Sequence, residues 1–591
     1  MIGAVPELDS QPKSIQSMYV WYNEEKLFVN RRYQRKLVWT LNEKQQLVES
    51  VLSRFPIPAI LLAERDAGGY EIIDGLQRLH TLMSFIDTGF PSLSAKYFDV
   101  TQFPTAKKRA DDGAFTPKKG VEVITAQDVS TFLDYSLAIS VMRSATEAEI
   151  DDVFARINTY GHRLSDQERR QAGVQSEFST LIRCLACDIR GDSSSDILGL
   201  AQMPQVSVDL PMTKHGYNVV ADETFWVEQG ILRSTDLRDS MDEQCLADIA
   251  ASVVGGTILE RSKEALDAVY DANDAENTRI SDALDVYGAD RFAQELKYCI
   301  DELINVCESE TPSKLRTLIF AGPSTNAFPA MFAVLMVALH ELLVGQPKMI
   351  SNYPGVKAAI TGLYARLETS RRSTVAVERR RNADAIKGLI APHLVDREAP
   401  VICGSNSTTD IDSTIRRSAI ELPHYELKQG LLRLDGSFAL DGDVLQRIIR
   451  TICAIANNGK DRAGSIMIGV TDKDEDAQRV KELYGLEPRK VGSRYVVGVR
   501  REAVALKEGP EDYFGRLKLA IRNSTLSTPV RDAVLSTIDY NDYYGLGVVV
   551  IAVPAQASLS YVDGDAYWRD GDETVKATSA AKIEELALRF R

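Results

Sequence analysis

The sequence predicts an α/β protein made of several domains. With 591 residues, the chain is too long for one hydrophobic core and suits about three domains. Short apolar runs bounded by turn residues alternate with amphipathic stretches in residues 15–175 and again in residues 415–591, as in α/β domains. Residues 176–395 show mostly helical periods. We therefore expect an α-helical region between two α/β domains, with a polar linker at 396–414.

In the first domain, a helix is expected from Thr40 to Phe55. Thr40 and Glu43 have the spacing of a capping box, and apolar residues recur on one face of the stretch that follows. The elements expected next are a strand at 57–62, a turn at 66–69, a strand that ends at residue 74 and a helix that ends near residue 89.

Two further pairs have capping-box spacing, namely Thr146 with Glu149 and Ser165 with Glu168. Such pairs satisfy free backbone groups at a helix start. We therefore expect Ser165 and Glu168 to begin a helix and do not include them in a site.

The most informative segment is Asp74-Gly75-Leu76-Gln77-Arg78, which lies where a short apolar strand turns into an amphipathic helix. The free N–H groups of a helix's first turn, a close approach at Gly75 and the guanidinium of Arg78 suit a phosphate. The alternative is an ordinary ion pair between Asp74 and Arg78 across one helical turn. The first interpretation predicts that the chain handles a nucleotide or a nucleic-acid backbone.

Three surrounding blocks support that interpretation: residues 32–35 with Trp39, residues 153–158 and residues 164–170. In this order they resemble the DGQQR-motif domains of the ParB/sulfiredoxin-like α+β fold, found in GmrSD-type and Ssp-type restriction proteins, over about residues 15–175. The resemblance implies NTP binding or hydrolysis, often coupled to cutting or nicking of DNA. The positions to which nucleotide binding transfers are Tyr33, Gln34, Arg35, Asp74, Gly75, Gln77, Arg78, Arg156 and Asn158.

Two departures from that family are visible. Leu76 stands where the motif usually has its first Gln, which puts nucleotide turnover in doubt. Many relatives also end in a His-Asn-His nuclease, whereas the six His residues of this chain are scattered. Any cutting is therefore expected to come from another part of the chain.

Composition excludes one class of nucleic-acid-binding protein and indicates the compartment in which the protein is expected. The 69 basic and 84 acidic residues give a net charge of −15, which excludes a protein that coats nucleic acid nonspecifically. The seven Cys residues are too sparse for a disulfide framework and indicate a reducing, cytoplasmic interior. Cys184 and Cys187 form one Cys-x-x-Cys without a second pair, so we expect core thiols and no zinc.

No membrane segment or secretory signal is expected. The N-terminus lacks a basic start and an apolar run, and the most lipophilic segment, residues 327–344, contains Pro329, His340 and Glu341. This segment predicts a buried helix in a soluble protein.

Two basic segments are weaker candidates for contacts with nucleic acid. Residues 105–120 carry five Lys or Arg residues and are expected to form a mobile, solvated loop, with contact to a phosphate backbone as the alternative. The second segment is a solvated helix face or a nucleic-acid patch, formed by Arg371, Arg372, Arg379, Arg380 and Arg381.

The C-terminal region gathers acidic residues at strand ends. Alternation along a strand places Glu426 and Lys428 on one face, and the buried strand of residues 464–470 delivers Asp472 at its end. Carboxylates that converge usually share a divalent cation, and oxygen ligands favour Mg²⁺ or Mn²⁺. Such an ion activates water for cleavage of a phosphodiester, while Lys428 offsets phosphate charge. The alternative is an exposed strand with alternating charges.

This region resembles the Schlafen AlbA-like α/β domain over about residues 415–591. The resemblance depends on Glu-x4-Glu-x-Lys, then residues 454–459, then residues 468–472, and the closing segments at 553–554 and 567–574. In eukaryotic Schlafens the matching carboxylates carry endoribonuclease activity, so the catalytic and metal-binding roles transfer to Glu421, Glu426 and Asp472. Other bacterial members are described only as DNA- or ATP-binding, and residues 460–463 lengthen the usual glycine turn.

Three functions remain open. The first is a bacterial anti-phage defence protein in which the N-terminal domain senses a nucleotide or modified DNA and the C-terminal domain cuts RNA or DNA with a metal ion. The second places NTP-dependent nicking in the N-terminal domain and leaves the C-terminal domain as a reader of nucleic acid. The third is a non-catalytic nucleic-acid-binding regulator. The expected partners are nucleic acid and a nucleoside triphosphate, without a membrane, in a monomer or a homo-oligomer.

Overall fold

The computed structural model divides the chain into two compact units, Met1–Val401 and Ile402–Arg591. It describes residues 7–31, 36–65, 68–160, 165–171, 176–192, 197–203, 206–207, 219–346, 348–368, 374–397, 408–418, 422–460, 462–541 and 543–590. Each unit contains helices and sheets, which confirms the general α/β class expected from the sequence.

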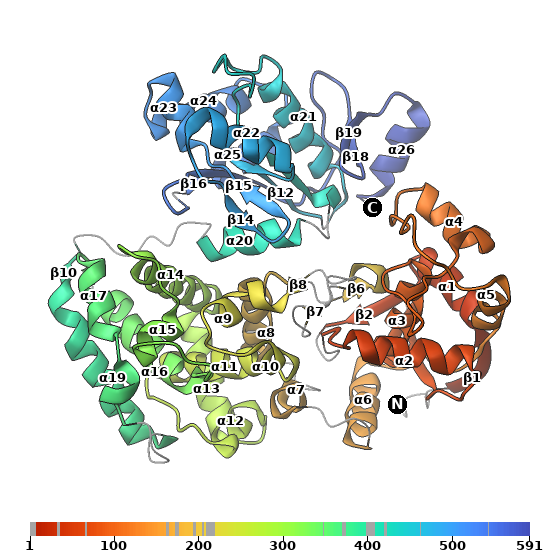
Figure 1. The fold of residues 1–591 in the computed structure, drawn as a ribbon, viewed down its shortest axis with the longest axis horizontal. Helices are drawn as coiled ribbons and strands as arrows, with labels where there is room; N and C mark the ends of the chain where they lie inside the picture. Colours follow the sequence, from red (N-terminus) through yellow and green to blue (C-terminus); the bar gives the residue numbers. More distant parts are fainter. Residues whose placement is uncertain are drawn as a thin grey trace. The chain divides into compact units, whose positions relative to one another are not determined.

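A six-stranded mixed sheet forms the N-terminal half of the first unit (Figure 1). Its strand order is β1-β5-β3-β4-β2-β6. The strands are β1 Glu7–Ser14, β2 Leu27–Asn30, β3 Ile60–Glu64, β4 Tyr70–Asp74, β5 Ser136–Arg143 and β6 Ile197–Gly199. Because β6 pairs with β2, the sheet takes its last strand from beyond residue 175, where the sequence predicted the domain to end.

Alternation along the strands divides the sheet into two buried faces. Ile60, Leu62 and Ile72 belong to the larger core, which α1, α2, α3 and α5 cover. Ala63 and Ile73 point to the other face, where they meet α6. The helices of this part are α1 Ile15–Asn23, α2 Leu41–Leu52, α3 Leu76–Ile86, α4 Pro104–Asp111, α5 Ala126–Leu133, α6 Glu147–Tyr160 and α7 Asp166–Gln171.

The capping pairs form as predicted. In α2 the hydroxyl of Thr40 accepts from the N–H of Glu43, whose carboxylate accepts from the N–H of Thr40. Reciprocal bonds also join Thr146 with Glu149 and Ser165 with Glu168.

The expectation of a mobile loop at 105–120 is wrong for its first half. Helix α4 begins at Pro104, a residue suited to the first helical turn, and buries Ala106 in the N-terminal core. Arg109 turns inward, where its guanidinium stacks on Tyr22 and pairs with Asp87 at 3.7 Å. These packing contacts stabilise a helix that its exposed lysines concealed in the sequence.

The rest of the first unit is α-helical, as expected. Its helices are α8 Glu177–Arg190, α9 Phe225–Glu228, α10 Ser234–Arg238, α11 Met241–Val254, α12 Lys263–Tyr270, α13 Ala275–Tyr287, α14 Ala289–Glu308, α15 Leu315–Phe320, α16 Pro329–His340, α17 Tyr353–Ile360, α18 Leu363–Arg366 and α19 Ala376–Ile390. Its short strands are β7 Val206–Ser207, β8 Val219–Val220, β9 Lys348–Ile350 and β10 Leu394–Asp396. Helix α16 is buried nearly all round in this core, as predicted. Among the described residues, no helix is both long and apolar enough to cross a bilayer.

The basic cluster of α19 is not a free cationic face within the described residues. Arg379 is buried and binds both carboxylate oxygens of Asp248 at 2.8 Å. Arg380 pairs with Glu341 and Asp384, and Arg381 pairs with Glu378. Arg371 and Arg372 lie outside the described residues. Arg379 therefore belongs to the core and not to the nucleic-acid patch proposed from the sequence.

The second unit is built on a four-stranded sheet of order β11-β12-β17-β16 and a three-stranded sheet of order β13-β15-β14. The strands are β11 Tyr425–Lys428, β12 Gly464–Ile468, β13 Val470–Thr471, β14 Arg489–Val491, β15 Arg494–Val496, β16 Asp539–Asn541, β17 Val548–Val553 and the hairpin of β18 Tyr567–Asp570 with β19 Glu573–Lys576. The helices are α20 Thr408–Arg417, α21 Val444–Ala456, α22 Asp474–Tyr484, α23 Arg500–Leu506, α24 Pro510–Arg522, α25 Thr528–Thr537 and α26 Ala580–Leu588.

The four-stranded sheet is also buried on both faces. Ile466 and Ile468 pack with α21, α24 and α25, whereas Met467 packs with Ile411 and Ile415 of α20. Helix α20 starts at residue 408, inside the segment 396–414 that the sequence predicted as a polar linker. The spacing of four between the two isoleucines is the helical signal that the polar composition obscured.

Candidate functional site

Strand β11 brings Glu426 and Lys428 to one side of the second unit. The strand pairs in parallel with β12, with Glu426 opposite Ile466 and Lys428 opposite Ile468. Because side chains two residues apart share a face, the two charged groups meet, and Lys428 Nζ lies 2.5 Å from Glu426 Oε1. The other carboxylate oxygen, Oε2, lies 2.8 Å from Nη1 of Arg569.

Arg569 is a buried cation supplied by the β18–β19 hairpin. Its side chain is only 1% exposed, and Nη1 donates to the hydroxyl of Thr574, its partner across the hairpin, at 3.0 Å. The Nε atom is buried without a hydrogen-bond partner among the described residues. Asn457, at the end of α21, fixes the hairpin by donating to the carbonyl of Tyr567 at 2.8 Å.

Asp472 follows a sharp turn between the two sheets. Gly469 has φ +105°, and a Cβ there would lie 3.1 Å from the carbonyl oxygen of Gly547, so only glycine suits the turn between β12 and β13. The turn places Asp472 at the end of β13, where Oδ2 lies 3.2 Å from Nη1 of Arg494. Asp472 is 51% exposed, whereas Arg494 is only 15% exposed.

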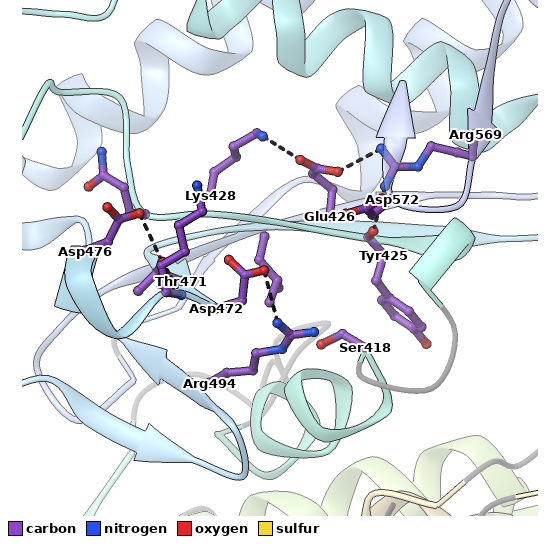
Figure 2. Close-up of a pocket in the computed structure, with 13 residues that line it drawn as sticks. Ser418, Tyr425, Glu426, Lys428, Thr471, Asp472, Asp476, Arg494, Arg569 and Asp572 are labelled. Carbon is purple, nitrogen blue, oxygen red and sulfur yellow. Dashed lines mark hydrogen bonds and ion pairs between the residues drawn. The ribbon is translucent and has the colours of Figure 1, made fainter. Parts of the chain in front are cut away.

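These residues line one cleft of about 280 Å³ (Figure 2). Four cations and four carboxylates contribute to it, so the formal charge of its lining is balanced. The complete lining is Ser418, Tyr425, Glu426, Leu427, Lys428, Gln429, Thr471, Asp472, Lys473, Asp476, Arg494, Arg569 and Asp572. Concave sites with converging polar groups are the usual places for ligands.

The loop after β11 is held by a buried carboxylate. Glu502 accepts from the N–H groups of Leu431 at 2.7 Å and Leu432 at 3.1 Å, and from the hydroxyl of Tyr513 at 2.6 Å. Burial raises the pKa of Glu502 above its ordinary value. Arg501 donates to the carbonyl of Gln429 at 2.8 Å. Gln429, which lines the cleft, is therefore connected to the core of the unit by hydrogen bonds.

The structure brings together Glu426, Lys428 and Asp472 of the predicted catalytic set, and Glu421 lies outside the described residues. The sequence analysis missed Arg494 and Arg569, because strand pairing brings them to the cleft from distant positions in the chain. Asp572 could have been found, since it lies in the turn of a hairpin already assigned to the closing strands.

The cleft does not contain a preformed metal cage among its described residues. No three His, Cys, Asp or Glu side chains of the described ranges gather closely enough to hold an ion, and Glu426 is already bound to two cations. Mg²⁺ often binds one or two protein carboxylates together with the phosphates of a substrate. The carboxylates of the cleft suit this mode of binding.

The second predicted site lies at the start of α3, where its residues bind one another. Asp74 ends β4, and its Oδ1 accepts from the N–H of Gly75 at 2.7 Å. Its Oδ2 lies 3.0 Å from Nη2 of Arg78, which also donates to the carbonyl of Ala59 at 3.1 Å. The ion pair that the sequence left as an alternative is therefore formed, and a carboxylate occupies the position where an anion would approach the helix start.

Gln77 points inward from α3. Its Oε1 accepts from the N–H groups of Val38 and Trp39, each at 3.3 Å, and its Nε2 donates to the carbonyl of Lys36 at 2.6 Å. These bonds fix the chain directly after residues 32–35. In the described structure Gln77 thus orders a neighbouring segment, whereas the sequence assigned it to nucleotide binding.

The remaining predicted nucleotide-binding residues are only partly described. Tyr33, Gln34 and Arg35 lie outside the described residues, as does the side chain of Asn158. Arg156 lies on α6, exposed, with Nε 2.9 Å from the carboxylate of Asp152.

Buried ion pairs hold both flanks of residues 32–35. On one side Arg31 Nη2 lies 2.7 Å from Asp192, and on the other Lys36 Nζ lies 3.1 Å from Glu243. Lys36 also donates to the hydroxyl of Ser240 at 2.8 Å. The partners belong to the helical part of the unit, so this part anchors Arg31 and Lys36.

Cys187 contributes to the same buried cluster. Nη2 of Arg31 lies 3.6 Å from its Sγ, and burial raises the pKa of this thiol to about 11. None of the six described cysteines forms a disulfide, and no metal-binding group among the described residues includes Cys184 or Cys187. Cys187 is buried on α8, whereas Cys184 is only partly buried, so the expectation of core thiols holds for Cys187 alone.

Comparison with known proteins identifies one relationship. Residues 18–174 match the family model of the GmrSD restriction endonuclease N-terminal domain. This match supports the resemblance inferred from the Asp74–Arg78 motif. It runs from within α1 to just after α7 and includes strands β2, β3, β4 and β5 of the six-stranded sheet. No curated protein and no solved structure matches the chain. The resemblance of residues 415–591 to Schlafen AlbA-like domains stays a prediction.

Proposed function

We propose that this protein is a restriction-type defence nuclease in which the first unit recognises a nucleotide or modified DNA and the second cleaves a nucleic acid. The match of residues 18–174 to a restriction endonuclease domain carries this proposal. The charged cleft at Glu426, Lys428 and Asp472 supports the assignment of cleavage to the second unit.

The cleft has the groups that a phosphodiester requires. Lys428 and Arg494 are partly exposed cations that offset phosphate charge. The buried guanidinium of Arg569 holds the carboxylate of Glu426 in place. Glu426 and Asp472, with Glu421 as the resemblance implies, are the proposed ligands of Mg²⁺ or Mn²⁺ once a substrate phosphate is present. Such an ion would supply an activated water and stabilise charge that develops on the phosphate.

In the first unit we propose NTP binding at the start of α3. Gly75 allows close approach of a phosphate, and Arg78 is a cation in the first turn of α3. A phosphate there would replace the carboxylate of Asp74 as the partner of Arg78. Gln77 would contribute indirectly, by fixing the chain next to residues 32–35.

A second candidate function leaves the C-terminal cleft as a reader of nucleic acid, with NTP-dependent nicking in the first unit. The ion pairs of Glu426 with Lys428 and Arg569 favour it, because a carboxylate bound by two cations is a poor metal ligand. In a third candidate, a non-catalytic regulator, both sites bind without turnover.

The experiment that separates these functions compares Glu426→Gln, Asp472→Asn and Arg78→Gln with the parent protein. Labelled RNA and supercoiled plasmid are incubated with Mn²⁺ or EDTA and with each NTP. Loss of cleavage in the Glu426 and Asp472 variants supports the proposal, and loss in the Arg78 variant alone supports nicking by the first unit. Absence of cleavage and phosphate release in the parent under every condition contradicts both. Glu482→Gln, an exposed carboxylate of α22, is the matched control.

A further inference from the structure

We infer that Asp472 masks an anion subsite at Arg494 and that a nucleic-acid phosphate displaces it. The inference deepens the proposed function, because it assigns the cation that receives the backbone and the group that must leave. The proposed ligand is a phosphodiester of RNA or DNA, and the carboxylate of Asp472 occupies the ligand's position beside Arg494.

The cleft contains two separate ion-paired groups (Figure 2). Lys428, Glu426 and Arg569 form the first, and Asp472 with Arg494 forms the second. Their burial differs: Glu426 and Arg569 are 14% and 1% exposed, whereas Asp472 is 51% exposed. Water screens an exposed carboxylate more effectively, so the pair with Arg494 is the easier one to open.

Arg494 is the more buried member of this pair, with 15% of its side chain exposed. It begins β15, in the middle of the three-stranded sheet, and its Nε is buried with no hydrogen-bond partner among the described residues. Nη1 carries the contact with Asp472 at 3.2 Å. A buried guanidinium with an unmet donor gains from a second acceptor, and the two non-bridging oxygens of a phosphodiester suit bidentate binding by an arginine.

Asp472, in contrast, is free to move away. It lies between β13 and α22, in a short loop whose next residue, Lys473, donates its N–H to the hydroxyl of Thr471 at 3.2 Å. Rotation of an exposed side chain costs little compared with loss of a charge-assisted bond. Lys473 is itself an exposed cation on the cleft wall. A phosphate at Arg494 would therefore meet a second positive group once Asp472 has rotated.

Charge balance gives the direction of the effect. With four cations and four carboxylates on its wall, the cleft offers a polyanion no net attraction until one carboxylate moves. Neutralising Asp472 leaves an excess of one positive charge and frees Arg494. Neutralising any carboxylate near a phosphate reduces repulsion, so the outcome that identifies a mask is a gain in metal-free binding that depends on Arg494.

The test measures binding of fluorescent 12-nucleotide RNA and DNA strands by anisotropy in EDTA, so that a metal-dependent cut cannot occur. We expect Asp472→Asn to tighten binding about 3- to 10-fold and Arg494→Gln to weaken it by a similar factor. The double variant should bind like Arg494→Gln, because the mask has no cation left to cover. The salt dependence of log Kd should fall by about one phosphate contact in the Arg494 variant.

Glu482→Gln is the control, since it neutralises an exposed carboxylate of α22 that pairs with Arg479 outside the cleft lining. Arg494→Met, which also removes the cation, replaces Arg494→Gln if the latter fails to fold by circular dichroism. Weakened or unchanged binding of the Asp472 variant, or gain of the same size in the Glu482 variant, overturns the inference. Tighter binding without any cleavage by the parent would uphold the inference and contradict the proposed function, so the two outcomes are distinguishable.

Discussion

The side-chain amide of Gln77 donates a 2.6 Å hydrogen bond to the carbonyl oxygen of Lys36 and so joins the start of α3 to the segment after residues 32–35. Its Oε1 accepts from two more backbone groups, at Val38 and Trp39. The two conspicuous polar blocks of the first domain are thus connected by one buried side chain.

Replacement of Gln77 by Leu should therefore destabilise the first unit. The change keeps the side-chain volume but removes the buried partner of the N–H of Val38 and of the carbonyl of Lys36, at a cost of roughly 2–4 kcal/mol. Urea unfolding followed by tryptophan fluorescence measures the effect. Gln46→Leu, on the exposed side of α2, is the control and should change stability by less than about 0.5 kcal/mol. Equal effects of the two variants would contradict the role assigned to Gln77.

A second prediction concerns Gly75. Its φ is +95°, and a Cβ there would lie 2.9 Å from Cγ1 of Ile60. Gly75→Ala should cost about 1 kcal/mol for the left-handed backbone and further energy for the close contact. Gly113→Ala is a matched control, because Gly113 has φ +82° and open space around its Cα. Thermal unfolding should show the larger loss for Gly75, and equal losses would show that the contact with Ile60 is relieved at no cost.

The third prediction is a pH dependence at Asp87. Burial raises the pKa of this carboxyl from 3.8 to about 6, although Arg109 and the hydroxyls of Tyr19 and Tyr22 oppose the shift. Between the two values the folded state binds more protons than the unfolded state, so stability decreases as pH rises from about 4 to about 6. The loss is roughly 1–3 kcal/mol and is complete above about pH 6.

The variant Asp87→Asn isolates this contribution. It cannot titrate, so its free energy of unfolding relative to the parent should rise between pH 4 and pH 6.5. Urea titrations at four pH values measure the difference. A constant difference across this range would show that the carboxyl does not titrate there.

A fourth prediction separates structure from binding in α19. Arg379→Met leaves the buried carboxylate of Asp248 without its bidentate partner and should destabilise the first unit by about 3–5 kcal/mol. Arg381→Met removes an exposed pair with Glu378 and should cost less than about 1 kcal/mol. Neither change should alter DNA affinity per folded molecule in a filter-binding assay. If Arg381→Met alone weakened DNA binding, the result would contradict this prediction and show that α19 contacts nucleic acid.

Local signals in the sequence predicted local structure well. The capping boxes, the strand that ends at Asp74 and the buried helix α16 each depend on residues within one or two turns. Helices α4 and α20 were missed, because their many charged residues conceal the few that are buried, such as Ala106 and Ile411. Their stability comes from contacts with distant segments.

The same division applies to the candidate sites. Period two along β11 was enough to place Glu426 beside Lys428. It could not show that Arg569 and Arg494 arrive from other strands and bind the acidic residues expected to hold a metal ion. Partners of this kind depend on sheet topology, which no short motif in this chain encodes.

The buried pairs of Arg31 with Asp192 and of Lys36 with Glu243 have a practical consequence for dissection of the protein. A fragment that stops at residue 175 would retain both cations, lose both anions and also lack the edge strand at residues 197–199. Unpaired charges in an apolar interior are strongly unfavourable. The segment that matches a restriction endonuclease domain should therefore aggregate when expressed alone. Because α8 and α11 belong to a core that continues to α19, a fragment that remains folded should extend through the whole helical region.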